Sequence, residues 1–300
     1  MRIGRVATLS DTGRRRLRNE DAYVCDPPLF AIADGMGGAQ AGEVASRLAA
    51  AAIAEGERGG LGEDDVAELV RAANASVYRH AVENPSAAGM GTTVTVAVVD
   101  EAAGSVVIGH VGDSRAYRIR DEELEQLTAD HSLVAELVRT GRLTPEQAVG
   151  HPHRSVITRA VGTEPSVDVD TFTLEAVHGD LYLLCSDGLT DMVSDADILG
   201  VADAAGREPD SVARMLVESA NRAGGDDNIT VVVFEVTEGE PRPETPTLEQ
   251  AEPAPEPEAE SPAPPVRRRG AGKGGRALAV IGLLAVVAVA LLVVWWSVKR

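Results

Sequence analysis

Residues 29–38 read LFAIADGMGG, an apolar run that ends in aspartate and glycine. A short apolar run bounded by a turn signal is typical of a buried strand, and Asp34 stands directly after it. The pattern recurs elsewhere: Asp113 follows SVVIGHVG, Asp187 follows DLYLLCS, and Asp227 directly precedes NITVVVFEV. Four aspartates therefore stand at the ends of apolar strands. If the sheets bring those ends to one rim, four carboxylates meet there.

Strand-like runs alternate with helical spacing through the first 237 residues. Strands are expected over residues 3–9, 29–33, 92–99, 105–111, 167–174, 180–185 and 229–236. In the third of these, valines alternate with threonine and alanine, which predicts one buried face and one milder face. Strands that follow one another without a helix, as over 92–120, exclude a repeating βαβ scheme. They favour antiparallel sheets covered by helices, an α+β fold.

Four helices are expected beside these strands. Apolar residues spaced three and four apart predict amphipathic helices over residues 41–52 and 66–77. Ser194 is expected to cap a helix over 195–205, and Asp210 or Ser211 to cap the stretch that follows.

The charge balance narrows the classes of partner. The chain has 28 Lys and Arg against 47 Asp and Glu, a net charge of -19. Residues 238–300 carry equal numbers of acidic and basic side chains, so the excess belongs to residues 1–237. Such a balance disfavours nucleic acid as a partner. It suits carboxylates gathered around cations.

The type of cation follows from the available donors. Only Cys25 and Cys185 are present, outside any CxxC pair, so neither a disulfide framework nor a thiolate zinc site is indicated. Carboxylate oxygens without a His or Cys cluster indicate hard ions, Mg²⁺ or Mn²⁺. Asp-Gly is also a common turn dipeptide, so Asp34-Gly35 or Asp187-Gly188 taken alone is interpreted as a plain turn, but turns do not explain all four aspartates.

The C-terminal part has a different composition. Residues 277–296 read ALAVIGLLAVVAVALLVVWW, long enough at 1.5 Å per residue to cross a bilayer core; a buried core helix is the alternative. Basic residues cluster before this run, which places the N-terminal part in the cytoplasm and residues 297–300 outside. Residues 239–265 are rich in Pro and Glu and are expected to form an extended tether.

The expected organisation is therefore a folded domain over residues 1–237, a disordered and then basic linker over 238–276, and a single membrane helix over 277–296. The protein is expected in the cell membrane, with its folded domain in the cytoplasm.

Six segments occur in the order and approximate spacing of a known family. They are Arg16–Asp21 (RLRNED), 33–38 (ADGMGG), 91–93 (GTT), 112–115 (GDSR), 186–188 (SDG) and 227–230 (DNIT). Over about residues 3–236 the chain resembles the metal-dependent protein phosphatases, the type 2C Ser/Thr family. With its tail it resembles the membrane-tethered bacterial members that partner transmembrane Ser/Thr kinases.

This resemblance implies a fold and a set of residue roles. The fold would be an αββα sandwich, two antiparallel sheets flanked by helices, with metal ions in a cleft at one end. Asp34 and Asp187 would bind or bridge a metal pair, helped by the Gly35 carbonyl and Asp227. Further implied roles are metal contacts by Glu20 and Asp21, a third, weaker metal at Asp113 with Asp187, and a phosphate clamp at Arg16.

The implied reaction is hydrolysis of phosphoserine and phosphothreonine on proteins. Two Mn²⁺ or Mg²⁺ ions would activate a water for in-line attack on phosphorus, while Arg16 holds the phosphoryl oxygens. Arg16, Asp34 and Asp187 would be the catalytic residues. Phosphorylated proteins, including membrane Ser/Thr kinases, would be the substrates, and we expect the catalytic domain to be monomeric.

One position departs from the family pattern. Many eukaryotic relatives carry a histidine after the Asp-Gly of the second motif, whereas this chain has Met36, which cannot donate a proton. The proton for the leaving group then comes from a metal-bound water or from another histidine, such as His151 or His153 in the segment that resembles the bacterial flap. Two other functions stay open: a catalytically silent phosphoprotein-binding relative, and a hydrolase of small phosphate esters.

Overall fold

The computed structural model describes residues 1–37, 41–56 and 62–238. The chain divides into two units, residues 1–245 and 246–300, and every described residue lies in the first. The expected membrane helix over 277–296, the linker from residue 239 onward and the external tail lie outside the described residues. Among the described helices, none has both the length and the apolar character needed to cross a membrane.

Two antiparallel sheets form the centre of the first unit. The five-stranded sheet has the order β1 (Arg2–Asp11), β11 (Ile229–Thr237), β10 (Leu181–Cys185), β7 (Arg115–Arg120) and β8 (Glu123–Gln126). The six-stranded sheet has the order β2 (Asp21–Asp26), β3 (Leu29–Met36), β5 (Val94–Asp100), β6 (Ser105–Val111) and β9 (Asp170–Glu175), with β4 (Gly91–Thr92) paired to β3.

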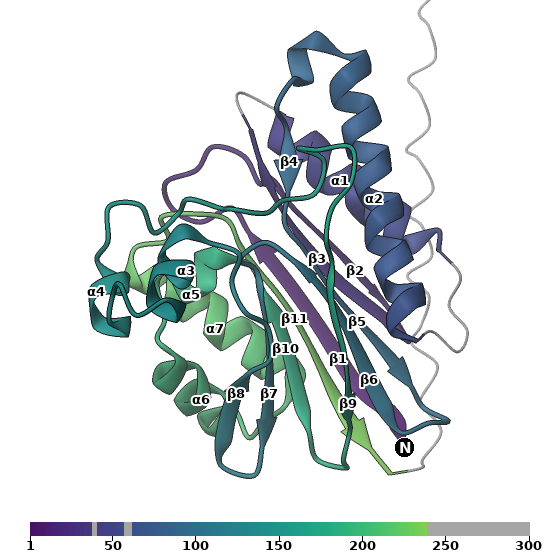
Figure 1. Ribbon diagram of the computed structural model, residues 1–300. Helices are drawn as coiled ribbons and strands as arrows, with labels where there is room; N and C mark the ends of the chain where they lie inside the picture. The colour runs from purple at the N-terminus through teal and green to yellow at the C-terminus, as the bar shows by residue number, and fades with distance from the viewer. Residues whose placement is uncertain (38–40, 57–61, 239–300) are drawn as a thin grey trace, which may run out of the picture. The chain divides into compact units, whose positions relative to one another are not determined.

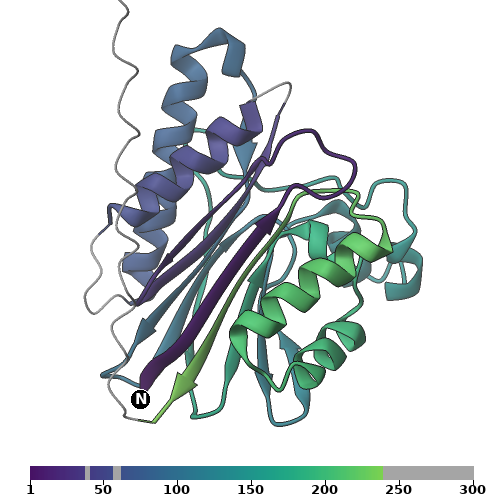
Figure 2. The ribbon, with the colours of Figure 1, turned by 180° about the vertical axis from the view of Figure 1, so that it is seen from behind.

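Helices cover the outer face of each sheet. The six-stranded sheet packs against α1 (Ala41–Ala54) and α2 (Glu63–Glu83). The five-stranded sheet packs against α5 (Asp187–Thr190), α6 (Asp195–Ala204) and α7 (Pro209–Ala223), on the opposite side in Figures 1 and 2. Two short helices, α3 (Leu133–Arg139) and α4 (Pro145–Val149), lie in the connection from β8 to β9, and a 3₁₀ turn spans Pro85–Ala87. The αββα sandwich expected from the sequence is confirmed.

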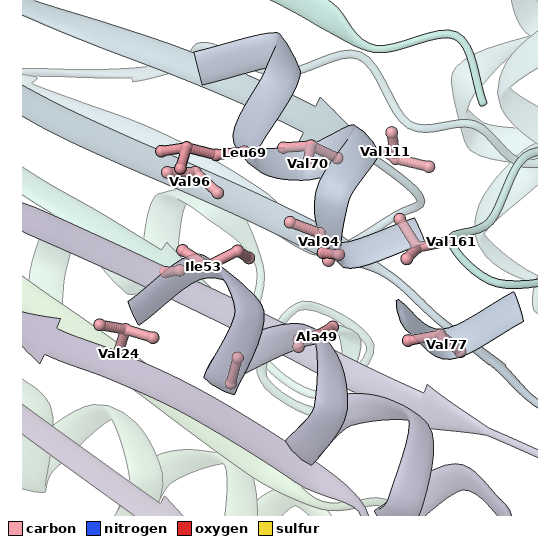
Figure 3. Packing of buried hydrophobic residues seen from close by; sticks show 14 of the residues in the cluster. Val24, Ala49, Ile53, Leu69, Val70, Val77, Val94, Val96, Val111 and Val161 are labelled. Atoms are coloured by element: carbon pink, nitrogen blue, oxygen red, sulfur yellow. The ribbon is translucent and has the colours of Figure 1, made fainter. Parts of the chain in front are cut away.

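Three apolar layers hold these elements together. Between the sheets, Phe30 and Tyr182 both stack on Phe234, with ring centroids 4.2 and 5.0 Å away. Between the six-stranded sheet and its helices, side chains such as Ile53 and Val70 pack on the strand valines (Figure 3). Each sheet is thus buried on both faces over its central strands, which explains why those strands are nearly continuous apolar runs.

Double burial also corrects one prediction. Both faces of β5 are buried from Val94 to Val99, so the expected milder face packs against other protein layers instead of facing water. The predicted run over 92–99 divides into β4 and β5. Strand β7 lies within the stretch over 92–120 that was expected to hold consecutive strands, whereas the short strands β2 and β8 were not predicted.

The predicted helix caps have different outcomes. Ser194 caps α6 by accepting from the Asp197 amide at 3.2 Å, as expected. Helix α7 starts earlier than predicted: Glu208 is its cap and accepts from the Ser211 amide at 2.8 Å, because Pro209 occupies the first helical position.

Candidate active site

Four strand ends meet at one rim of the sandwich. Asp34 lies within β3, near its end, and Asp113 comes just after β6. Strands β3 and β6 run in the same direction, because β5 pairs with each of them in antiparallel fashion. In the other sheet β10 and β11 are antiparallel, so the end of β10, with Asp187, lies beside the start of β11, with Asp227. The sequence prediction that these aspartates converge is confirmed.

A cleft of about 370 Å³ opens at this rim. Six of the eight residues singled out from the sequence line it: Arg16, Glu20, Asp34, Gly35, Asp187 and Asp227. Asp113 is buried, and neither it nor Asp21 is part of the lining. Three apolar side chains, Met36, Ile157 and Met192, complete one part of the cleft wall.

The carboxylates in and below the cleft are held in an environment that disfavours charge. Burial raises the pKa of Asp34 well above its usual range, and the nearby charges of Asp21 and Asp187 raise it further. Burial likewise raises the pKa of Asp187 well above its usual range, with Asp113 and Asp227 adding to the effect. Like charges gathered in this way are stable only as protonated acids or beside cations.

The two deeper carboxylates behave in the same way. Burial raises the pKa of Asp21 to about 6, although hydrogen bonds from Thr230 and Ser186 oppose the shift. Burial also raises the pKa of Asp113 to about 7, with the charge of Asp130 adding to the shift.

Three carboxyl oxygens at the site are buried without a hydrogen-bond partner in the described part of the chain. They are one oxygen each of Asp21, Asp113 and Asp187. A buried carboxyl oxygen left unpaired is costly, so each needs either a proton or a cation. The donors are all oxygens, which suits Mn²⁺ or Mg²⁺. The residues present therefore fit hard divalent ions.

The side chains are not already arranged around one point. Within residues 1–37, 41–56 and 62–238, no three His, Cys, Asp or Glu side chains stand as a ready-made metal-binding group. Two of the carboxylates are engaged by protein donors instead. Asp227 pairs with Arg16 at 2.6 Å, and one Asp21 oxygen accepts from Ser186 at 2.9 Å and Thr230 at 2.6 Å.

The two Asp-Gly pairs are not plain turns. Asp34-Gly35 lies inside β3, and Asp187-Gly188 opens α5. A Cβ on Gly35 would clash with the carbonyl oxygen of Gly42, and a Cβ on Gly188 with that of Asn228. Glycine is therefore required at both positions by close backbone approach, which corrects the turn interpretation.

Sequence reasoning gave no role to Asn228, although it quoted the DNIT segment that contains it. Its side chain is 4% exposed and makes three hydrogen bonds to the loop between β1 and β2. The amide nitrogen donates to the carbonyl oxygens of Thr12 at 3.0 Å and Arg18 at 2.8 Å, and the amide oxygen accepts from the Glu20 N–H at 2.7 Å. Asn228 thereby fixes the loop that presents Arg16 to the cleft.

Met36 and two histidines, His151 and His153, bear on the source of the proton for the leaving group. Met36 lines the cleft, so the residue at this place offers no proton. His153 is exposed, and neither it nor His151 is among the described residues of the lining. The same segment instead contributes Arg154, which pairs with Asp191 at 3.4 Å. Asp191 and Asp226 also line the cleft and were not predicted.

Two nearby histidines serve the structure around Asp113. His131 accepts from the Gly112 N–H at 3.0 Å and contacts Asp170 through its other ring nitrogen at 3.1 Å. His110 is fully buried against Thr95 at 3.0 Å, and burial lowers its pKa to about 3, so it is neutral. His131 therefore makes local contacts through both ring nitrogens and His110 through one.

Comparison with known proteins agrees with this geometry. Residues 13–232 match the family model described as Protein phosphatase 2C. The serine/threonine protein phosphatase PstP of Mycobacterium tuberculosis is 45% identical over 237 residues, which cover 78% of this chain and 45% of that protein. The chain thus matches less than half the length of this relative. The serine/threonine phosphatase stp of Listeria innocua is 37% identical over 75% of this chain and 93% of its own length.

A solved structure matches in the same region. The catalytic domain of the serine/threonine protein phosphatase PstP, crystallised with two manganese ions, superposes with a TM-score of 0.72 at 42% identity. The match covers 79% of this chain and 99% of that domain. The metal dependence expected from the donor set therefore agrees with the ions bound by a close structural relative.

Proposed function

The chain belongs to the protein phosphatase 2C family, and from this membership we propose that it is a metal-dependent phosphatase of phosphoserine and phosphothreonine in proteins. The observation that carries the proposal is one cleft holding Asp34, Asp187 and Asp227 beside the Arg16 guanidinium. A guanidinium and a set of carboxylates together suit a phosphate ester, because the first binds the phosphoryl oxygens and the second hold the cations that phosphate chemistry needs.

The residues of the cleft divide this work. Asp34, Asp187 and Asp227, with the Gly35 carbonyl, would hold two Mn²⁺ or Mg²⁺ ions, and Asp113 with Asp187 a third. When bound, the ions lower the pKa of water and so supply a nucleophile at neutral pH. Glu20 and Asp21 would contribute to the metal site through water or directly.

Arg16 would bind the phosphate group of the substrate. Its guanidinium is half exposed and ion-paired to Asp227 at 2.6 Å, which aims it into the cleft. A planar guanidinium binds two phosphoryl oxygens at once and so orients phosphorus for attack. Met36, Ile157 and Met192 contribute apolar side chains to the lining of the cleft.

The test compares two aspartate variants of the full chain. Asp187→Asn removes a cleft carboxylate and is expected to lower turnover of p-nitrophenyl phosphate at least roughly a hundredfold. Asp203→Asn at the end of α6, which breaks a pair with Arg207, serves as the matched control and should retain activity. Turnover that survives a chelator, or that is unchanged in Asp187→Asn, would overturn the proposal.

The substrate class needs its own measurement. A hydrolase of small esters would turn over p-nitrophenyl phosphate but not phosphopeptides, and a silent phosphoprotein-binding relative would bind phosphopeptides without hydrolysing either. We expect turnover of both, because the cleft is open to solvent over exposed residues such as Arg154 and Ser155.

The membrane attachment is a further part of the proposal. Residues 1–237 would form a cytoplasmic catalytic domain, tethered through 238–276 to a single membrane helix over 277–296. The supporting observation is the uncharged twenty-residue run with basic residues before it. Membrane Ser/Thr kinases would then be accessible partners. The full chain should stay in the membrane fraction after carbonate extraction, and removing residues 277–300 should move the protein to the soluble fraction. An unchanged membrane fraction would contradict the attachment.

A further inference from the structure

The loop between β1 and β2, residues 12–20, carries an unusual surface beside the cleft. It contains four arginines, Arg14, Arg15, Arg16 and Arg18, and between the last two lies Leu17. The Leu17 side chain is 100% exposed, more than any other large apolar residue among the described ones. A single exposed leucine is ordinary on a protein surface. Leu17 indicates a binding surface only if it lies beside the cleft and its backbone is held in place.

The loop is held rigidly in this conformation. The Gly225 carbonyl accepts from the backbone N–H groups of Arg14 at 2.7 Å and Arg15 at 3.2 Å. The buried Asn228 amide bonds to Thr12 and Arg18, the residues on either side of this turn. These bonds hold the backbone on either side of Leu17. Leu17 is presented to solvent next to Arg16, which lines the cleft.

Apolar surface continues around the cleft. Met36, Ile157 and Met192 line it, and Val156, beside Ile157, is 42% exposed. The segment that carries Val156 is anchored as well, because the Val156 carbonyl accepts from the Leu133 N–H at 2.9 Å. Exposed apolar residues thus stand on two separate segments that meet at one cleft.

Two loop arginines form ion pairs that an acidic ligand can replace. Arg15 pairs with Asp226 at 3.0 Å, and these side chains are 72% and 52% exposed. Arg18 lies 3.8 Å from Glu43, and these side chains are 54% and 24% exposed. Solvent-accessible pairs of this kind contribute little to stability, so an acidic ligand can take the place of Asp226 or Glu43 at small cost.

From these observations we propose that Leu17, with the arginines on either side, is a specificity-determining docking surface for phosphoprotein substrates. It selects segments in which an apolar side chain adjoins the phosphorylated residue and acidic side chains flank both. This inference rests on the proposed phosphatase function and names the class of substrate sequence. The apolar neighbour packs on Leu17 while the phosphate lies at Arg16, and the acidic flanks meet Arg14, Arg15 and Arg18.

The experiment uses the full chain and two phosphothreonine peptides with acidic ends, one with leucine and one with serine on both sides of the phosphothreonine. The wild type is expected to prefer the leucine peptide in kcat/KM. Leu17→Ser should lower that preference roughly tenfold, because the peptide leucine loses its apolar contact. Val82→Ser, which removes another exposed apolar residue at the end of α2, is the matched control and should keep the preference.

The possible outcomes distinguish the docking surface from the phosphatase function. A wild type that hydrolyses p-nitrophenyl phosphate but has no peptide preference overturns the docking surface and leaves the phosphatase function standing. No hydrolysis of either kind of substrate overturns both. An equal change in kcat/KM for both peptides in Leu17→Ser also overturns the docking surface. If Leu17→Ser weakens binding to phosphatidylserine vesicles while the peptide preference persists, the loop contacts membranes and the proposal is wrong.

Discussion

Replacing Asn228 by alanine tests how the cleft is built. Its amide makes three hydrogen bonds to the loop carrying Arg16, at 2.7 to 3.0 Å, from a side chain that is almost fully buried. Each lost bond, with its partner left unpaired, costs about 1 kcal/mol. The free energy of unfolding is therefore expected to fall by about 3 kcal/mol.

A matched control separates the local role from general destabilisation. Asn74 on α2 is equally buried and bridges another loop, donating to the Glu164 carbonyl at 3.1 Å and accepting from the Gly162 N–H at 2.7 Å. Asn74→Ala should lose about 2 kcal/mol by the same reasoning. Because it does not touch the loop of Arg16, it should leave phosphate binding nearly unchanged.

Two assays on the full chain give the answer. Guanidinium unfolding is followed by far-ultraviolet circular dichroism, because both tryptophans, Trp295 and Trp296, lie outside the described domain. Competitive inhibition by inorganic phosphate reports on Arg16, and its inhibition constant should rise roughly tenfold in Asn228→Ala only. A stability within about 0.5 kcal/mol of the wild type, or equal weakening of phosphate inhibition in both variants, would refute the reasoning.

Three further outcomes are expected. Arg16→Lys should raise KM for p-nitrophenyl phosphate roughly tenfold with a smaller change in kcat, since an ammonium cannot bind two phosphoryl oxygens at once; steady-state kinetics in which KM is unchanged would contradict the clamp. Burial raises the pKa of Asp21 to about 6 and of Asp113 to about 7, so the metal-free folded chain retains protons that the unfolded chain releases near pH 4, and its stability falls as pH rises through this window. Thermal melts should therefore show a larger rise in Tm on adding Mn²⁺ at about pH 7.5 than at about pH 5, and an equal rise at both would count against a metal site there. Burial raises the pKa of Cys185 to about 12, so in a Cys25→Ser variant a thiol reagent should label nothing until denaturant is added; labelling of the native protein would show that β10 opens.

Much of the fold could be predicted because its signals are local. The apolar run before Asp34 and the run after Asp227 are strands in the structure, and the cap at Ser194 is as expected. Short strands such as β8, whose four residues are mostly exposed, have no apolar pattern and form only because β7 offers them a partner. The cap of α7 was displaced to Glu208, since its position depends on Pro209 as well as on the cap residue.

The sequence by itself determined the kind of chemistry. Carboxylates at strand ends indicated a site for hard cations, and the resemblance to the type 2C phosphatases implied the phosphate clamp at Arg16. Only the tertiary structure decided which groups share a cleft and which lie beneath it. Asp34 lines the cleft, whereas Asp113 is buried outside the lining. The tertiary structure also shows that glycine is needed at position 35, because the Gly42 carbonyl lies where a Cβ would stand. It shows as well that the buried amide of Asn228 joins the two ends of a loop 210 residues away in the sequence. Contacts between distant segments depend on how the layers pack, and no local pattern encodes that packing.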